Sequence, residues 1–164
     1  MSRFIEKVAI VTGSSNGIGR ATAVLLASEG AKVTITGRDS ARLEETKQAI
    51  LKEGVPEENI NSVVADITSS EGQDRLISST LEKFGKVNIL INNAGANIPD
   101  KNGKTRTEGG TDTFLKMFQL NLQSVVEMTQ KIRPHLAKTR GEIVNVSSIA
   151  AGPAAQPQEV LQLI

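Results

Sequence analysis

The sequence predicts an α/β fold in which a doubly wound parallel sheet carries helices on both faces and is truncated after its fifth strand. Short apolar runs that suit buried strands alternate with amphipathic segments that suit helices, beginning at residue 8. This alternation favours parallel strands joined by right-handed crossovers. A glycine-rich turn joins the first predicted strand to the first predicted helix, the place where a doubly wound sheet binds its ligand.

The first half of the sheet is predicted to be complete. Its first strand is the apolar run Val-Ala-Ile-Val that opens at Val8. The second, Lys-Val-Thr-Ile-Thr, is rich in the β-branched residues that favour strands. Gly30 and Gly54 are placed to end two helices. The expected strands are 8–11, 32–36 and 61–65, and the expected helices are 17–29 and 40–52.

The second half is predicted to stop after its second strand. An irregular stretch at 96–111 is rich in Gly, Asn, Lys and Thr, which predicts a surface loop. Thr111 or Asp112 then caps a long helix, and Pro134 is expected to bend it or make it irregular. The remaining elements are expected at 71–84 (helix), 87–91 (strand), 112–138 (helix) and 142–146 (strand).

Composition argues against several classes of protein. The 164 residues carry 19 lysines and arginines against 18 aspartates and glutamates, and this net charge of +1 gives no reason to expect a nucleic-acid partner. Without cysteine, neither a disulfide nor a thiolate metal site is expected, and no metal site is predicted. His135, the single histidine, is expected to interact with the end of its helix. Because no signal-peptide core or membrane-length apolar run is seen, no membrane partner and a cytoplasmic location are expected.

The glycine-rich turn has the spacing of a dinucleotide-binding motif. Three glycines follow a strand and open a helix, and a second strand ends about 20 residues further on, as the motif requires. The glycines allow a tight turn and a close approach of the backbone to a pyrophosphate, and the helix N-terminus attracts its charge. The predicted cofactor-binding residues of the turn are Gly13, Ser14, Ser15, Asn16, Gly17, Ile18 and Gly19.

The end of the second strand favours NADP(H) over NAD(H). An acidic residue there would bind the ribose 2′-hydroxyl and repel a 2′-phosphate. The chain has Gly37 at that place and Arg38 next, and arginine suits bidentate binding of phosphate. Asp39 adjoins Arg38 and weakens the preference, and Asn16 adds no second positive charge inside the turn. A solvated surface arginine is the alternative interpretation of Arg38.

Four further segments resemble the short-chain dehydrogenase/reductase family in order and spacing, over about residues 3–157. Asp66-Ile67 follows the third strand, and Asn92-Asn93-Ala94-Gly95 follows the fourth. Asn121 lies within the long helix, and Ser148 follows the fifth strand, with Ser147 beside it. Each alone has a plain structural interpretation: Asp66 as a turn residue, Asn121 as a solvent-facing helix residue, the serines as an ordinary strand end. Together they identify the chain as similar to this family.

The resemblance implies a Rossmann-like fold, a nicotinamide cofactor and hydride transfer to or from a small-molecule carbonyl or alcohol. It implies that Asp66 and Ile67 bind the adenine side, that Asn93, Ala94 and Gly95 line the cofactor site, and that Asn121 and Ser148 assist catalysis. It also implies a helix irregularity at Asn121. The family's catalytic Tyr-x-x-x-Lys motif is absent, since the chain has no tyrosine and carries Val160, Leu161 and Gln162 near its expected position. None of these side chains is a general acid. Negligible turnover is therefore expected of this chain.

We expect the chain to consist of two segments, and several alternative functions stay open. Residues 1–149 are expected to form the dinucleotide-binding domain, and 150–164 a divergent, poorly ordered C-terminal segment. Without further C-terminal elements, apolar surface on the long helix and the fifth strand would be exposed. The alternative functions are a non-catalytic NADP-binding or dimerising regulatory module, either a homo-oligomer or paired with a full-length relative, and a mispredicted or frameshifted gene product. An S-adenosylmethionine-binding domain is disfavoured by the glycine spacing.

Overall fold

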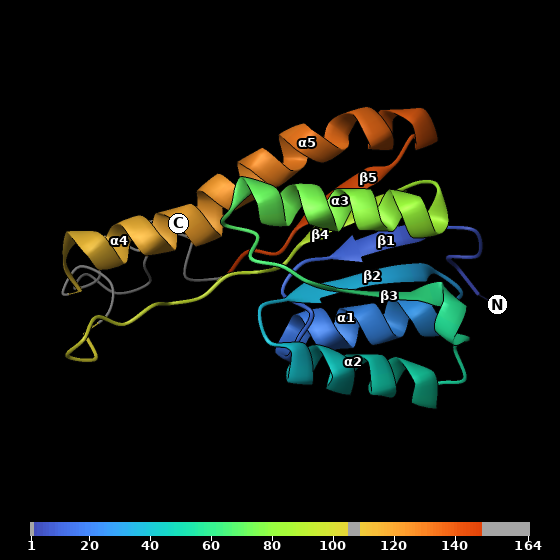
Figure 1. Ribbon diagram of the computed structural model, residues 1–164, viewed down its shortest axis with the longest axis horizontal. Helices are drawn as coiled ribbons and strands as arrows, with labels where there is room; N and C mark the ends of the chain where they lie inside the picture. Colours follow the sequence, from blue (N-terminus) through green and yellow to red (C-terminus); the bar gives the residue numbers. More distant parts are fainter. Residues whose placement is uncertain (1, 105–108, 149–164) are drawn as a thin grey trace.

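The computed structural model describes residues 2–104 and 109–148. The predictions for 150–164, including the positions 160–162, lie outside the described residues. Within them, five parallel strands form one sheet in the order β3-β2-β1-β4-β5 (Figure 1). The strands are β1 (Val8–Val11), β2 (Lys32–Gly37), β3 (Ile60–Val64), β4 (Ile89–Asn92) and β5 (Glu142–Asn145). The order reverses between β1 and β4, as the predicted doubly wound sheet requires.

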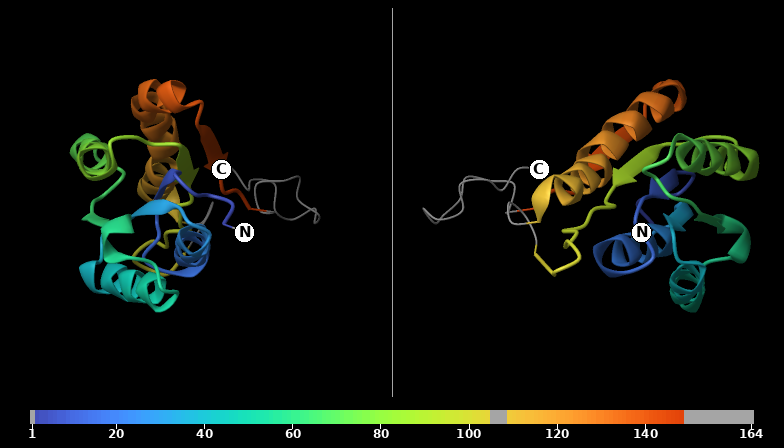
Figure 2. Two further views of the ribbon diagram at one scale, coloured as in Figure 1. Left: turned by 90° about the vertical axis from the view of Figure 1, so that its right-hand side faces the viewer. Right: turned by 60° about the vertical axis from the view of Figure 1, so that its left-hand side comes forward.

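Helices cover both faces of this sheet, as Figures 1 and 2 show. On one face α1 and α2 pack against Ala9, Val11 and their neighbours through a buried cluster that includes Leu26 and Leu43. On the other face α3 and α5 enclose Ile10 in a second cluster. Because side chains alternate along a strand, β1 supplies residues to both clusters. The helical elements are α1 (Gly17–Ser28), α2 (Ser40–Lys52), η1 (Glu57–Asn59), α3 (Ser70–Phe84), α4 (Gly110–Phe118), η3 (Gln119–Gln123) and α5 (Ser124–Thr139).

The long helix predicted from the sequence is divided near Asn121, where the family resemblance implies an irregularity, and not at Pro134. The α-helical geometry continues through Pro134 to Thr139, so the irregularity expected at the proline is not found there. Instead, residues Gln119–Gln123 form a π-helical turn between α4 and α5. Such turns inside α-helices often mark functional positions, and this one contains Asn121.

The strand ends agree with the predictions to within one or two residues, and the largest difference lies at the start of β4. Strand β4 begins at Ile89 rather than at Val87. The preceding residue, Asn88, is buried, and its Oδ1 accepts a hydrogen bond of 3.0 Å from the backbone N of Val8. The Asn88 side chain therefore fastens the start of β1 to the neighbouring strand.

The predicted exposure of apolar surface is confirmed. All of β5 is exposed, with Ile143 at 37% and Val144 at 47%. On α4, Phe114 and Leu115 are also exposed, at 43% and 54%. Among the described residues, no helix is long and apolar enough to span a membrane.

Candidate functional site

An open cleft of about 1240 Å³ lies at the carboxyl ends of the strands. The loops that follow β1, β2, β3, β4 and β5 all contribute to its walls, and α4 and η3 close one end. In open α/β sheets, ligands bind outside the carboxyl ends of the strands where the strand order reverses. The cleft lies at this place, between the loops that follow β1 and β4.

The glycine turn packs directly against the segment after β4. Gly13 has a φ of +64°, and a Cβ added there would lie 2.7 Å from Cα of Ala94. A Cβ at Gly19 would lie 2.4 Å from both Nδ2 of Asn93 and the carbonyl oxygen of Gly13. Real Cβ atoms do not tolerate such distances, so these two positions require glycine. The sequence motif therefore describes a close backbone contact as well as a turn.

The start of α1 offers its backbone N–H groups to the cleft. Asn16 is the N-cap residue, and its side chain makes no capping hydrogen bond. The N–H groups of the first turn of a helix have no partner inside the helix. Together with the positive end of the helix dipole, they suit an anion such as a pyrophosphate. Ile18, which is 67% exposed, also lines the cleft beside this turn.

Thr12 joins the two loops and was not among the predicted site residues. It is 1% exposed, and its Oγ1 accepts hydrogen bonds from the backbone N of Asn93 (3.0 Å) and of Ala94 (3.1 Å). The same hydroxyl donates to the carbonyl oxygen of Ile91. In return, Nδ2 of Asn93 donates to the carbonyl oxygens of Thr12 and Gly13. These bonds hold the Asn93–Ala94 segment against the glycine turn.

Ser14 and Ser15, predicted together, have different surroundings. The Ser14 hydroxyl is buried, donates to the carbonyl oxygen of Val11 and accepts from the backbone N of Thr36 at 2.8 Å. It fastens the turn to β2 and is not on the wall of the cleft, and Gly17 is not on the wall either. Ser15 lines the cleft, and a Cβ on Gly37 would lie 3.0 Å from Cβ of Ser15 and 3.1 Å from its Oγ.

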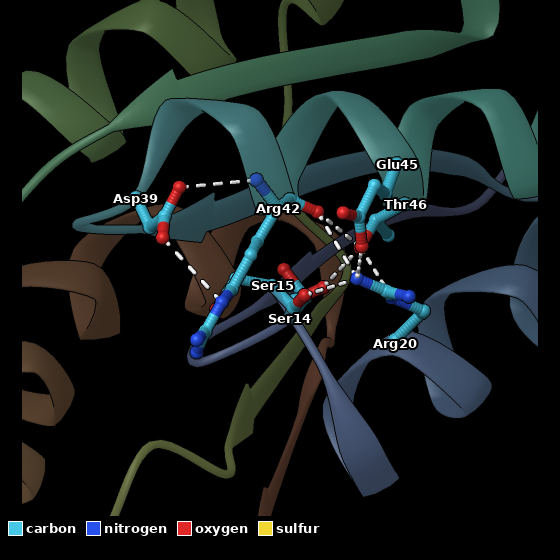
Figure 3. A network of polar contacts seen from close by, with 7 residues as sticks. All are labelled: Ser14, Ser15, Arg20, Asp39, Arg42, Glu45 and Thr46. Atoms are coloured by element: carbon cyan, nitrogen blue, oxygen red, sulfur yellow. Dashed lines mark hydrogen bonds and ion pairs between the residues drawn. The ribbon is translucent and has the colours of Figure 1, made fainter.

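Arg20 ties the glycine turn to α2, as Figure 3 shows. Its Nη2 donates to the carbonyl oxygen of Ser15 (2.6 Å) and to the carboxylate of Glu45 (2.8 Å). Its Nε donates to Oγ1 of Thr46 (2.9 Å), which is itself bonded to the carbonyl oxygen of Ser14. This network was not predicted from the sequence. It fixes the distance between the glycine turn and the start of α2.

The loops after β2 and β3 form the end of the cleft where Arg38, Asp66 and Ile67 lie. Oδ1 of Asp66 accepts hydrogen bonds from the backbone N of Thr68 (2.9 Å) and from its hydroxyl (2.8 Å). Burial raises the pKa of the Asp66 carboxyl, but the hydrogen bonds from Thr68 and the positive charge of Arg38 outweigh it, so the pKa lies below its usual value. Asp66 is thus both a turn residue and a charged residue of the cleft wall.

Asn121 and Ser148 lie at the opposite end, with the π-helical turn and β5. Oδ1 of Asn121 accepts from the backbone N of Ala96 (3.0 Å), and its Nδ2 donates to the carbonyl oxygen of Ala96 (3.1 Å). A Cβ on Gly95 would lie 3.2 Å from this Oδ1. The π-helical turn therefore holds the segment after β4 in place. Among the described residues, no group of acidic, histidine or cysteine side chains could hold a metal ion.

The sequence of the chain matches the profile of the short chain dehydrogenase family over residues 7–159. The chain belongs to the short-chain dehydrogenase/reductase family. The chain is 36% identical to a curated relative, an uncharacterized oxidoreductase of Staphylococcus saprophyticus. The match covers 88% of this chain and 60% of that protein. It is 34% identical to levodione reductase of Leifsonia aquatica, covering 90% of this chain and 54% of the relative. The family member thus spans little more than half the length of these relatives.

Solved structures of the family share the fold. A Caenorhabditis elegans short-chain dehydrogenase/reductase of unknown function, crystallised with cofactor, superimposes with a TM-score of 0.91 at 63% identity. That match covers 94% of this chain and 57% of the other. Glucose dehydrogenase of Caenorhabditis elegans in its apo form gives a TM-score of 0.85 at 57% identity, with 96% and 61% covered. The predicted Rossmann-like fold is confirmed.

Proposed function

We propose that this chain binds NADP(H) and forms the cofactor-binding part of an oxidoreductase. That enzyme would transfer a hydride between the cofactor and a small-molecule carbonyl or alcohol. The family uses nicotinamide cofactors, and two relatives bear the names levodione reductase and glucose dehydrogenase. When bound, the nicotinamide supplies or accepts the hydride. The residues of this chain would hold the cofactor and orient the substrate.

The observation that carries the choice of NADP(H) is the contact between Ser15 and Gly37. An NAD-type site needs a carboxylate at the end of the second strand to bind the ribose 2′-hydroxyl. Here that position is Gly37, and a Cβ added there would lie 3.0 Å from Cβ of Ser15, so that Ser15 would have to shift by a few tenths of an ångström. Arg38 follows on the wall of the cleft. A site that lacks the carboxylate and presents a guanidinium favours a 2′-phosphate.

The remaining predicted residues have distinct proposed roles. The glycine turn and the start of α1 would bind the pyrophosphate, because the glycines leave the backbone accessible and the first-turn N–H groups point to an anion site. Asp66 and Ile67 would flank the adenine, and Asn93, Ala94 and Gly95 would line the nicotinamide half of the cleft. The hydroxyl of Ser148 would donate a hydrogen bond to the substrate oxygen, while Asn121 orients the backbone at Ala96.

Arg38→Gln tests this proposal directly. Hydrogen bonds to charged groups contribute about 1.5–3 kcal/mol, so we expect the variant to bind NADP⁺ about 10-fold to 100-fold more weakly. Affinity for NAD⁺, which has no 2′-phosphate, should change less than about twofold on this reasoning. Both affinities are measured by calorimetric titration. Arg133→Gln, an exposed arginine of α5 outside the cleft wall, is the matched control. Equal losses for both cofactors would contradict the proposal.

A second candidate, a dimerising binding module, is favoured by the exposed apolar side chains of α4 and α5. Phe114 and Phe118 lie with ring centroids 6.3 Å apart, and Leu115 and Val126 are 54% and 46% exposed. Contiguous exposed apolar surface commonly marks a protein interface. We expect sedimentation analysis to show dimers of the wild-type chain and monomers of Leu115→Asp, with Lys116→Asp as the control. A wild-type chain that stays monomeric at all concentrations would exclude self-association.

A further inference from the structure

The glycine turn contains an exposed side-chain amide. Asn16 is exposed and lines the cleft. It is the N-cap residue of α1, yet its side chain makes no capping hydrogen bond. Ser14, in the same turn, is by contrast buried and bonded to the backbone of β1 and β2. The Asn16 amide is therefore less restrained than the hydroxyl two residues before it.

The residue that follows Asn16 gives this amide a reactive neighbour. The pair Asn-Gly occurs twice in the sequence, at 16–17 and at 102–103. In such a pair the backbone N of the glycine can attack Cγ of the asparagine, because glycine has no Cβ that obstructs the approach. A Cβ added at Gly17 meets nothing within 4 Å, so the space beside this peptide is open. As a residue of the first turn, Gly17 also has no acceptor for its N–H inside the helix.

The peptide between Asn16 and Gly17 can turn while the chain before it stays in place. Nη2 of Arg20 holds that chain by a hydrogen bond of 2.6 Å to the carbonyl oxygen of Ser15 (Figure 3). The ψ of Asn16 is −179° and the φ of Gly17 is +52°. Opposite rotations about these two bonds turn only the intervening peptide plane, and glycine accepts the φ values that result. The rotation breaks a single neutral hydrogen bond, from the backbone N of Arg20 to the carbonyl oxygen of Asn16.

We propose that Asn16 is a deamidation site, and that its conversion to aspartate or isoaspartate weakens dinucleotide binding. The backbone N of Gly17 gives up its proton and forms a bond to Cγ of Asn16. The bond from Cγ to Nδ2 breaks, and ammonia leaves with that proton. Water then opens the cyclic imide at one of its two carbonyl carbons, so the reaction needs neither an oxidant nor a reductant. Both products carry a carboxylate where the neutral amide stood.

The new carboxylate lies at the helix end that attracts anions. An acidic N-cap suits the helix itself, so α1 should stay folded in the aspartate form. A pyrophosphate at the same helix end would meet a like charge, and this repulsion corresponds to a loss of about 10-fold or more in affinity. This consequence rests on the proposed function, whereas the deamidation does not. A bound dinucleotide would engage the first-turn N–H groups and keep the peptide from turning, so the cofactor would protect its own site.

Peptide mass spectrometry of the aged chain tests the modification. The folded chain is kept at physiological temperature in mildly alkaline buffer, with and without saturating NADP⁺. The incubation lasts several times as long as the chain unfolded in guanidinium chloride needs to convert both Asn-Gly pairs. We expect aspartate and isoaspartate at residue 16, and less of both with NADP⁺ present. An Asn16 amide that stays intact, or equal conversion with and without bound NADP⁺, would overturn the inference.

Calorimetric titration of the converted chain, separated by anion exchange, tests the consequence. We expect NADP⁺ and NAD⁺ to bind about 10-fold more weakly than to fresh chain, both alike because they share the pyrophosphate. Asn16→Gln should keep its own starting affinity through the incubation, since its longer side chain forms the cyclic imide far more slowly. Asn102→Gln changes the other Asn-Gly pair, outside the cleft wall, and should age as wild type does.

The outcomes separate this inference from the proposed function. A chain converted at residue 16 that binds both cofactors as tightly as fresh chain would overturn the inference and leave the proposed function standing. Loss of affinity in aged Asn16→Gln equal to that of wild type would overturn it as well. A fresh chain that binds neither cofactor would overturn the proposed function, and the mass of the residue 16 peptide would still decide whether Asn16 deamidates.

Discussion

Gly19→Ala is expected to weaken dinucleotide binding by about 100-fold or more. The added Cβ would lie 2.4 Å from Nδ2 of Asn93 and from the carbonyl oxygen of Gly13. One of these is backbone, so the clash cannot be relieved by a change of rotamer. Either the turn moves away from the segment after β4 or Asn93 loses its bonds to Thr12 and Gly13. In both cases the first-turn N–H groups leave their positions.

The size of this effect follows from the bonds that would be lost. Two hydrogen bonds to a charged phosphate, at about 1.5–3 kcal/mol each, correspond to a loss of about 100-fold or more in affinity. Crowding of a well-packed site adds a destabilisation of about 1–3 kcal/mol. Calorimetric titration and thermal unfolding measure the two effects separately. Gly54→Ala is the control for affinity: a Cβ there meets nothing within 4 Å, so cofactor binding should not change, although the φ of +80° makes alanine strained and should lower stability. An affinity of Gly19→Ala close to that of wild type would contradict the packing described above.

The second large expected effect is an absence of turnover. Purified chain of these 164 residues should bind NADPH but not oxidise it in the presence of carbonyl substrates. The family relation implies a tyrosine as the proton donor, and the chain contains none. The titratable side chains on the described wall of the cleft are Arg38, Arg42 and Asp66. None of them lies at the end that contains Ser148 and Asn121.

The loss of a positioned general acid alone lowers a rate by about 10²–10⁴-fold. The measurement is the decrease of NADPH absorbance with a panel of aldehydes and ketones. Glucose dehydrogenase of Caenorhabditis elegans provides the positive control, followed in the opposite direction as the rise of reduced-cofactor absorbance when it oxidises its sugar substrate. NADPH consumption that rises with the concentration of the chain and is removed by Ser148→Ala would show that catalysis proceeds without the tyrosine.

The local patterns of the sequence were sufficient to predict most of the fold. Most strand residues are apolar or β-branched, and Gly30, Gly54 and Gly85 follow the ends of α1, α2 and α3. The glycine turn with Gly13 and Gly19 was also predicted, because its motif lies in one contiguous stretch of the sequence. The π-helical turn at Asn121 followed only from the family resemblance, because no residue near it breaks a helix.

The contacts that hold the site together could not be predicted in this way. Thr12 binds the backbone of Asn93 and Ala94, which lie in another loop about 80 residues away. Arg20 binds Ser15 and side chains of α2, and a sequence pattern shows only that it is a charged residue on a helix. A buried threonine hydroxyl at the end of a strand is a usable signal only when its partner is known. Polar contacts between distant segments require the fold to be assembled first.

Calorimetric titration of the wild-type chain with NADP⁺ and with NAD⁺ at the same ionic strength tests the central claim most directly. The contact of Ser15 with Gly37 and the guanidinium of Arg38 predict that NADP⁺ binds at least about 10-fold more tightly. Its affinity should fall as salt is added, because the preference is electrostatic. Equal affinity for the two cofactors, tighter binding of NAD⁺ or no binding of either would contradict the assignment of the cleft as an NADP(H) site.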